Sequence, residues 1–377
     1  MREIRTYGSE GGGTRQRVLP TPIKGLLSKG AFHLLLSRAV RDGGLYAFCL
    51  EGRSMKIFLS TSFASRDARK GRDLLDRLER LPIHGVELDY RIPDPVFREM
   101  TGLLKRSRLQ VVSLHNFCPV PPLVPPGKTG GDLLDLSALD RDERTRAVRW
   151  TVKTLENAND LEAPVVILHG GRVDMDPELD RLHGMLERCD GPEDPRFREL
   201  LDSKLAERRR KRAPHLDALL WSLDRLAREA ERLGVVLGLE NRAHYHELPG
   251  LEEFPDLFRE LDGAPLAYWH DVGHGHLNRL LGLWESLGPP DFLKDRLAGV
   301  HLHDARGRTD HLPPGAGELD PAPVVEAVGG EVPWVVEIRP GTSDEDVRRG
   351  LDHLQELFSG LSPSPERVRK RASSIYR

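Results

Sequence analysis

The sequence predicts a parallel (β/α)8 barrel, an α/β fold, and three observations lead to that fold class. Eight short apolar runs alternate with amphipathic helical stretches between residues 55 and 358. Some of the runs, such as Val165–Leu168, are apolar throughout, as expected of parallel strands covered by helices. No Gly-x-Gly-x-x-Gly motif follows the first run, which argues against a dinucleotide-binding sheet. Eight such units favour a barrel over an open doubly wound sheet, which usually has fewer strands.

The apolar runs place the ends of the eight expected strands. We expect these ends at Leu59, Leu88, Leu114, Leu168, Leu239, Trp269, Leu302 and Ile338. The stretches between them carry an apolar stripe on one face only, as in Leu219–Leu233, where Asp, Arg and Glu fill the other face. This one-sided pattern is typical of helices that pack on a sheet.

Two long insertions interrupt the regular spacing, after the third and fourth strands. One covers about 117–144 and is rich in proline, and the other covers about 172–214 and has a helical pattern of its own. Segments that follow a strand lie on the catalytic face of such a barrel. We therefore expect lids or substrate-binding elements, with a surface excursion as the alternative.

Residues outside the barrel pattern divide the chain into three parts. Residues 1–54 hold a Gly11-Gly12-Gly13 run and no sustained period, which predicts a poorly structured leader or a mis-assigned start. Residues 55–358 form the expected barrel domain. Residues 359–377 are interpreted as a basic, frayed tail.

Composition restricts the class of protein and its partners. Charged residues make up 31% of the chain and the net charge is -3, so there is no overall basic footprint and nucleic acid is an unlikely partner. The three cysteines, Cys49, Cys118 and Cys189, are odd in number and far apart, which fits a reducing cytoplasm. No apolar run is long enough to span a membrane. We expect a small-molecule substrate, and a homo-oligomer is an open alternative.

Six residues within two positions of the predicted strand ends are potential metal ligands. They are His115, His169, Glu240, Asp271, His301 and Glu337. Each alone has a structural explanation, because strand-end charges are usually solvated and a lone histidine is usually hydrogen-bonded. Together they converge on the barrel axis, where unpaired carboxylates would repel one another. A divalent cation is the natural solution to that arrangement.

Four motifs carry a resemblance to a known superfamily. They are Leu239-Glu240-Asn241, Asp271-Val272-Gly273-His274, His301-Leu302-His303-Asp304 and Asp310-His311-Leu312-Pro313-Pro314-Gly315-Ala316-Gly317. In order and spacing, the chain from Met55 to about Phe358 resembles the xylose isomerase-like barrel superfamily, with its sugar isomerases, ketose epimerases and endonuclease IV group. By position, the resemblance implies shared metal ligands at Glu240, Asp271, His301 and Glu337. Such a set suits manganese, cobalt, magnesium or zinc.

The resemblance implies two alternative mechanisms. In the isomerase and epimerase branch, two glutamates, here Glu240 and Glu337, exchange a proton with a metal-bound hydroxy-ketone. In the hydrolytic branch, extra histidines hold further zinc ions, and His115, His169, His274 and His311 fall at those positions. The chain has Thr309-Asp310-His311 where the endonucleases have Asp-x-His, so the third metal site stays open. We assign catalysis to Glu240, Glu337 and His274.

Polar residues just beyond the strand ends are candidates for substrate binding. The candidates are Arg172, Arg242, His244, His246, His303, Arg306 and Arg308. Arginines there suit a phosphate or carboxylate, although exposed loop arginines are an equally good explanation. His303 faces the same way as His301 because strand side chains alternate with period two.

The function favoured at this point is hydrolysis of a bulky phosphate- or ribose-containing small molecule. The superfamily includes a hydrolase that remodels cobamides by cleaving their lower-ligand loop, and a mouth rich in histidine and arginine would suit such a substrate. The alternative is a sugar or sugar-phosphate isomerase or epimerase with one divalent metal. A DNA-repair endonuclease and a non-catalytic metal-binding protein are weaker alternatives.

Overall fold

The computed structural model describes residues 50–51, 54–122, 130–188, 191–330 and 332–360. Eight parallel strands close into a barrel, each paired with its neighbours in chain order and the last paired with the first. The strands are β3 (Ile57–Ser60), β4 (Gly85–Leu88), β5 (Gln110–His115), β6 (Val165–Leu168), β8 (Val236–Glu240), β10 (Leu266–Asp271), β11 (Leu297–Leu302) and β14 (Trp334–Val336). The predicted fold class is therefore confirmed, and each expected strand end lies within two residues of the observed one.

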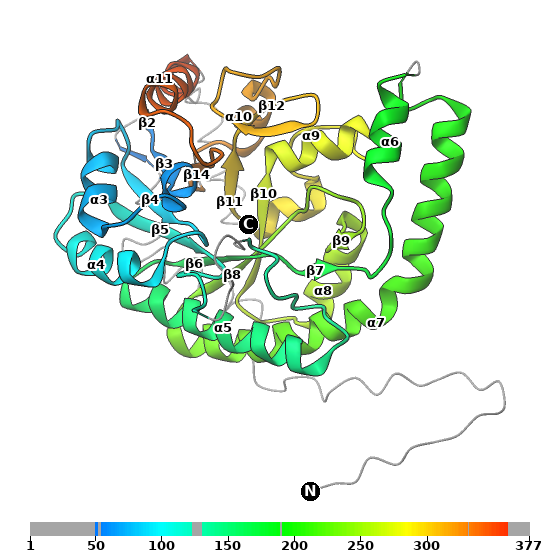
Figure 1. Cartoon of the computed structure of the whole chain (residues 1–377), viewed down its shortest axis with the longest axis horizontal. Coiled ribbons are helices and arrows are strands. Elements are labelled where there is room, and N and C mark those ends of the chain that lie inside the picture. The colour runs from blue at the N-terminus through cyan, green and yellow to red at the C-terminus, as the bar shows by residue number, and fades with distance from the viewer. Residues whose placement is uncertain (1–49, 52–53, 123–129, 189–190, 331, 361–377) are drawn as a thin grey trace, which may run out of the picture.

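Helices surround the barrel, as Figure 1 shows. They are α2 (Ser62–Ser65), α3 (Gly71–Glu79), α4 (Asp94–Leu104), α5 (Arg141–Asp160), α6 (Leu179–Leu186), α7 (Pro195–Leu233), α8 (Phe254–Glu260), α9 (Val272–Leu280), α10 (Ala322–Val328) and α11 (Asp344–Gly360). Two short 3-10 helices, Leu251–Glu253 and Asp291–Arg296, lie before α8 and β11. Three small antiparallel pairs complete the fold: β1 (Leu50–Glu51) with β2 (Ser54–Met55), β7 (Gly171–Arg172) with β9 (Glu247–Leu248), and β12 (Asp304–Arg306) with β13 (Thr309–Leu312).

The second insertion differs from its expected form. We expected it to end at Pro214, but α7 runs through that proline as one helix of 39 residues. A proline removes one backbone donor, and both halves of α7 bury apolar side chains that hold the helix together. With α6, the N-terminal half of α7 forms an arm at the edge of the molecule (Figure 1), where Phe197 and Leu201 pack with Tyr245 and Leu281.

The chain ends lie mostly outside the described residues. Residues 1–49 of the expected leader and 361–377 of the expected tail are not described. Strands β1 and β2 span the expected boundary at residue 55, and α11 extends to Gly360. Among the described residues, no helix combines the length and apolar character needed to cross a bilayer.

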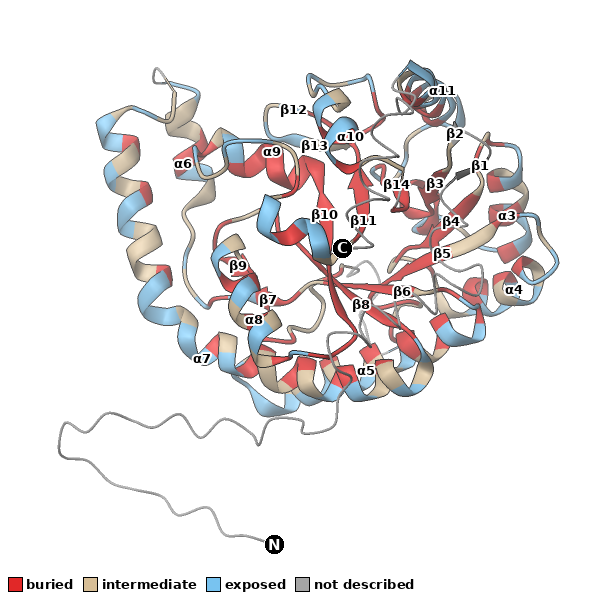
Figure 2. Ribbon diagram, turned by 180° about the vertical axis from the view of Figure 1, so that it is seen from behind, coloured by how far each residue is buried: buried red, intermediate tan, exposed pale blue. Residues whose placement is uncertain are grey.

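Apolar side chains fill the barrel below its C-terminal end, and Figure 2 shows the strands as the buried centre of the molecule. The interior cluster consists of Phe58, Val112, Val165, Ile167, Val236, Ala267, Trp269, Ala298 and Val335. Trp269 is its largest member, and its ring fills the space in front of Gly299, where a Cβ atom would lie only 2.2 Å from the ring. The indole meets the His301 ring edge-on at 5.2 Å. Trp269 therefore forms the floor of the polar centre, directly below His301.

Candidate metal centre

Period-two alternation along the strands places carboxylates on the barrel axis. In β8, Val236 faces the interior and Glu240 lies four residues further along the same face. In β10, Trp269 faces the interior and is followed two residues later by Asp271. Glu337 follows Val335 of β14 in the same way. The apolar filling of the barrel therefore ends in buried acidic side chains at its C-terminal end.

Asp271 also fixes the turn from β10 to α9. It is the N-cap residue of α9, and its Oδ1 accepts a hydrogen bond from the backbone N–H of His274 at 2.6 Å. The Asn241 side chain ties the end of β8 to this turn, since its Oδ1 accepts from the Asp271 N–H and its Nδ2 donates to the Asp271 carbonyl. This capping places His274 one helical turn above Asp271.

The described residues contain three groups of side chains that could each hold a metal ion. In each group the potential ligand atoms lie within 4.8 Å of one another. The first group is His115, His169 and Glu240; the central group is Glu240, Asp271, His301 and Glu337; the outer group is Asp271, His274, His303 and His311. Glu240 belongs to two groups and so does Asp271. The groups are therefore joined by shared carboxylates.

Most of the histidines are held by one ring nitrogen, which leaves the other as a potential ligand atom. His115 and His274 use Nδ1 on the backbone carbonyls of Asn116 and Asn241, at 3.3 and 3.0 Å. A carbonyl only accepts, so these rings carry their proton on Nδ1 and leave Nε2 as a ligand atom. His169, His301 and His311 are held in the same manner by the carboxylates of Asp132, Glu87 and Asp310.

His303 differs from the other histidines of the outer group. Its Nδ1 accepts a hydrogen bond from the backbone N–H of His311 at 2.8 Å, so the proton of a neutral ring lies on Nε2. That Nε2 lies 3.1 and 3.2 Å from the two carboxylate oxygens of Asp271. We interpret His303 as a residue that holds Asp271 in place, which leaves Asp271, His274 and His311 as the ligand set of this group.

A buried carboxylate shapes the loop that carries His311. Asp304 accepts hydrogen bonds from four backbone N–H groups, those of Ala305, Gly315, Gly317 and Leu319, at 2.8 to 3.0 Å. These bonds close the Asp310–Gly317 motif into a compact loop. His311 itself has a φ of 53°, an uncommon value for a residue with a side chain, and this turns its ring toward Glu337.

Electrostatics explains why these groups suit cations. Burial would raise the pKa of the Glu240 carboxyl, but His301, His115 and His169 hold it well below its usual range. Burial would lower the pKa of His301, but Glu87, Glu337 and Glu240 raise it well above its usual range. The carboxylates therefore draw protons onto the adjacent imidazoles. Divalent cations would supply that positive charge without protons.

The side chains fit a metal cluster in three respects. The donor set combines imidazole nitrogen with carboxylate oxygen, which suits zinc, cobalt or manganese. The outward ring nitrogens are held by carboxylates or carbonyls, an arrangement that orients metal-bound histidines in proteins. Glu87 Oε1, fully buried beside His301, has no hydrogen-bonding partner among the described residues. A buried carboxylate oxygen without a partner is expected next to a cation site.

The expected substrate-binding residues do not all meet at this centre. Arg242 is buried and lies near it, with its guanidinium 2.9 Å from Glu247, 3.1 Å from Asp132 and 3.5 Å from Glu240. His246 is buried, its Nδ1 has no hydrogen-bonding partner among the described residues, and its ring stacks on His244 with the centroids 6.0 Å apart.

The three other expected arginines have partners elsewhere. Arg172 binds Asp135, Arg308 binds Asp180, and Arg306 donates to the Ala316 carbonyl. All three side chains lie in exposed parts of the molecule.

Several residues near the centre were not predicted from the sequence. Glu87 lies at the end of the second strand, so the strand-end criterion that found Glu240 would also have found it. Asp132 lies inside the proline-rich insertion, where no periodic signal marks it. Tyr90 meets His115 edge-on at 4.9 Å, and the neighbouring Arg91 pairs with buried Asp89 at 2.6 Å. These contacts depend on the closed barrel.

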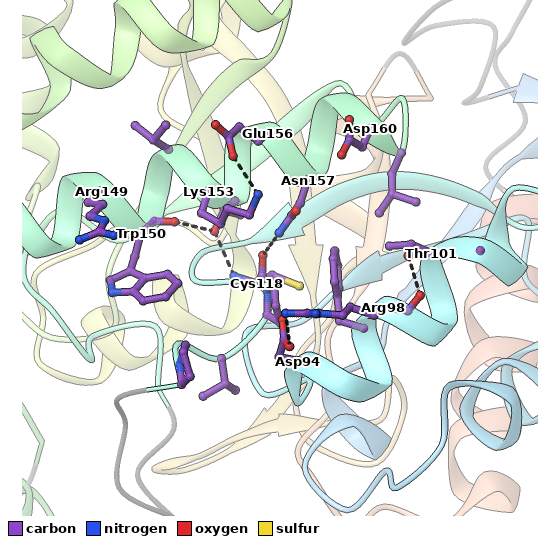
Figure 3. A pocket seen from close by; sticks show the side chains of 18 of the residues that line it. Asp94, Arg98, Thr101, Cys118, Arg149, Trp150, Lys153, Glu156, Asn157 and Asp160 are labelled. Atoms are coloured by element: carbon purple, nitrogen blue, oxygen red, sulfur yellow. Dashed lines mark hydrogen bonds and ion pairs between the residues drawn. The ribbon is translucent and has the colours of Figure 1, made fainter.

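A cavity of about 910 Å³ lies outside the barrel, between α4 and α5 (Figure 3). No residue of the three donor groups lines it. Its link to the centre is the segment after His115, because Thr154 accepts a hydrogen bond from the Cys118 N–H and Asn157 donates to the Cys118 carbonyl. Helix α5 thereby anchors the segment that follows the His115 strand.

Comparison with known proteins identifies the family. The sequence pattern of the xylose isomerase-like TIM barrel family matches residues 75–357, which is most of the chain. The chain belongs to this family. The resemblance inferred from the four motifs is thereby confirmed. No curated protein sequence matches the chain significantly.

Solved structures of this xylose isomerase-like family share the fold. The D-allulose 3-epimerase of Methylomonas sp. bound to D-allulose has a TM-score of 0.56 and 14% identity, over 80% of this chain and 97% of that one. The 3-keto-D-glucoside 4-epimerase YcjR of E. coli has a TM-score of 0.55 and 17% identity, over 80% and 99%. A Thermus thermophilus protein whose crystal was soaked with zinc chloride has a TM-score of 0.51 and 22% identity, over 82% and 100%.

Proposed function

We propose that the chain is a metal-dependent hydrolase that cleaves a phosphate- or ribose-linked bond in a small molecule. The observation that carries this proposal is the sharing of Glu240 and Asp271 between neighbouring donor groups. Each of these carboxylates directs one oxygen toward each of the two groups that it joins. Glu240 Oε1 lies 2.6 Å from His301, and Glu240 Oε2 lies 3.0 Å from His169. Carboxylates in this position suit a cluster of two or more cations.

The environment of Glu240 suits a ligand of bound cations. Its pKa is held well below the usual range despite burial, because His301, His115 and His169 surround it. Bound cations would replace the positive charge of those imidazoles and would be held by the same ionised carboxylate. The Arg242 guanidinium, 3.5 Å away, stabilises the ionised carboxylate further. Glu240 is therefore suited to holding cations in both of the groups to which it belongs.

The chemistry of the centre divides between the cations and the side chains. Bound divalent cations would supply Lewis acidity, which activates water and neutralises charge that develops on a phosphoryl group. His303 and Asn241 hold Asp271 in place from two sides. His274, fixed through Nδ1, would hold a cation through Nε2.

The mouth of the barrel contributes groups that would bind a substrate. Buried His246 offers an Nδ1 atom that no described residue hydrogen-bonds, and His244 stacks beside it. A hydroxyl or phosphate of the substrate would complete that hydrogen bond. A sugar phosphate diester, such as the lower-ligand loop of a cobamide, has both kinds of group.

A sugar isomerase or epimerase is the second candidate function, and the comparisons favour it over hydrolysis. Structures of similar fold are described as D-allulose and L-ribulose 3-epimerases. The central group alone contains two glutamates, Glu240 and Glu337, with Asp271 and His301. One cation there would supply the Lewis acidity for proton transfer between these glutamates and a ketose. The sequence identity to each of these two epimerases is 14%.

Isotopes separate the two reactions. Purified protein would be incubated with cobamides, phosphoribosides and ketose phosphates in ¹⁸O-water, and in parallel in deuterium oxide. Hydrolysis incorporates one solvent oxygen into a product and leaves carbon-bound hydrogen unchanged. Deuterium on a sugar carbon without ¹⁸O uptake would overturn the hydrolase proposal and establish the second candidate.

A further inference from the structure

The insertion after β5 reaches the first donor group. The Asp132 Oδ1 atom lies 2.8 Å from His169 Nδ1, and the opposite ring nitrogen, Nε2, lies 3.0 Å from Glu240 Oε2. We propose that Asp132 is a positioning residue of the candidate metal centre, which fixes His169 with its Nε2 atom directed at Glu240. This inference rests on the metal dependence proposed above.

The chemistry of the pair explains how Asp132 acts. An ionised carboxylate only accepts hydrogen bonds, so the His169 nitrogen that faces Asp132 must carry a proton. The lone pair of a neutral ring then lies on Nε2, on the side of Glu240 and His115. Carboxylates that hold metal-bound histidines in this way fix the tautomer and the ring orientation, and make the imidazole a stronger ligand.

Asp132 is itself held by a buried cation. One terminal nitrogen of the Arg242 guanidinium lies 3.1 Å from Asp132 Oδ2 and 2.9 Å from Glu247 Oε1. The Arg242 side chain is only 6% exposed, and its other terminal nitrogen lies 3.5 Å from Glu240. One guanidinium therefore connects the insertion, the β9 segment and the shared carboxylate. Asp132 occupies a fixed place between Arg242 and His169.

The neighbouring glycine supplies a second, independent observation. A Cβ atom at Gly131 would lie 2.6 Å from Cε1 of His169 and 3.4 Å from Cε1 of His115. The backbone of the insertion thus packs directly against both imidazoles of the first group. A side chain there would displace the His169 ring, so glycine is required for this approach. The insertion forms one wall of the first donor group.

The test compares zinc binding by chelator-treated full-length variants. Asp132→Asn keeps the side-chain shape, Asp132→Ala removes it, and Asp135→Asn is the matched control. Asp135 lies in the same segment but binds Arg172 and does not touch His169. Calorimetry and elemental analysis would give the stoichiometry and the affinity of each zinc equivalent. We expect both Asp132 variants to weaken one equivalent by about 10- to 100-fold, with the others unchanged.

A spectroscopic readout separates positioning from general stability. At a zinc concentration that just fills the wild-type sites, protein with ¹⁵N-labelled histidine should show His169 bound through Nε2 and protonated on Nδ1, and Asp132→Ala should show a larger fraction of His169 without bound zinc. Asp135→Asn should match wild type in both measurements. If Asp132→Ala lowers the melting temperature of the metal-free protein and leaves every zinc affinity unchanged, the residue is merely structural and the inference is wrong.

The two proposals fail in different ways. If wild type binds no zinc, cobalt or manganese, the proposed function fails before the variants matter. If wild type binds several zinc ions and the Asp132 variants bind them equally well, the cluster stands and only the role of Asp132 is refuted.

Discussion

Removal of the metal should make the stability of the protein depend on pH, with His169 as the clearest contributor. Burial and Arg242 lower the pKa of this imidazole, but Asp132 and Glu240 outweigh them and raise the pKa from 6.5 to about 9. His169 therefore binds a proton more tightly in the folded, metal-free chain than in the unfolded one. Its contribution to stability is fully present below pH 6.5 and is lost as the pH rises through about 9.

The size of the effect follows from that difference. One pKa unit corresponds to about 1.4 kcal/mol, so His169 contributes about 3 kcal/mol at low pH. For a barrel of this size, such a loss lowers the melting temperature by about 5 °C. Thermal unfolding of chelator-treated protein at intervals between about pH 6.5 and 9.5 measures it directly. His301 and His311, whose pKa values carboxylates raise despite burial, should add to the decrease.

Zinc-loaded protein provides the contrast. A metal-bound imidazole must be neutral, so zinc binding at pH 7 releases protons and its apparent affinity rises with pH. The melting temperature of the loaded protein should then stay level or rise over the same range. Asp132→Asn should reduce the pH dependence of the metal-free protein, because Asp132 raises the pKa of His169. A metal-free melting temperature that is constant or increases over that pH range would refute the reasoning.

Two further predictions concern the ligands and the barrel floor. Glu240→Gln and Asp271→Asn should each lower bound metal and reduce turnover by orders of magnitude, since a neutral amide is a poor ligand; full activity of chelator-treated wild type would contradict metal dependence. Gly299→Ala should cost about 3 kcal/mol because its Cβ would collide with Trp269, whereas Gly288→Ala, which meets no atom within 4 Å, should melt like wild type.

The sequence predicts the barrel well because its signals are local. An apolar run followed by an amphipathic helix identifies each βα unit without knowledge of the others. The clustering of Glu240, Asp271 and His301 was also predictable, because these residues lie at or next to strand ends, and parallel strand ends meet at one face. Closure of the barrel then brings together residues that are 61 positions apart in the chain, as in the 2.6 Å contact between Glu240 and His301.

The residues that hold those side chains in place by hydrogen bonds could not be predicted from such local signals. Asp132 contacts His169 across 37 positions, from a segment without helix or strand period. The role of His303 depends on which ring nitrogen accepts the His311 N–H, a detail of loop conformation that no spacing rule gives. Arg172 and Arg308 illustrate the converse, because both satisfy the strand-end criterion and then pair with nearby aspartates. Hydrogen-bonding partners therefore need the folded structure.

The first group and the outer group provide the sharpest prediction about the reaction. A proton transfer between Glu240 and Glu337 needs only the central group, so His169→Gln and His311→Gln should keep turnover within about tenfold of wild type. Hydrolysis by a cluster with shared carboxylates needs the first group and the outer group as well. Each variant should then lose at least about 100-fold in kcat. His353→Gln, on the exposed face of α11, is the matched control. We expect the larger loss, together with loss of one metal equivalent per variant. Near-normal turnover by both variants would remove the main support for hydrolysis, because the sharing of Glu240 and Asp271 would then have no chemical role.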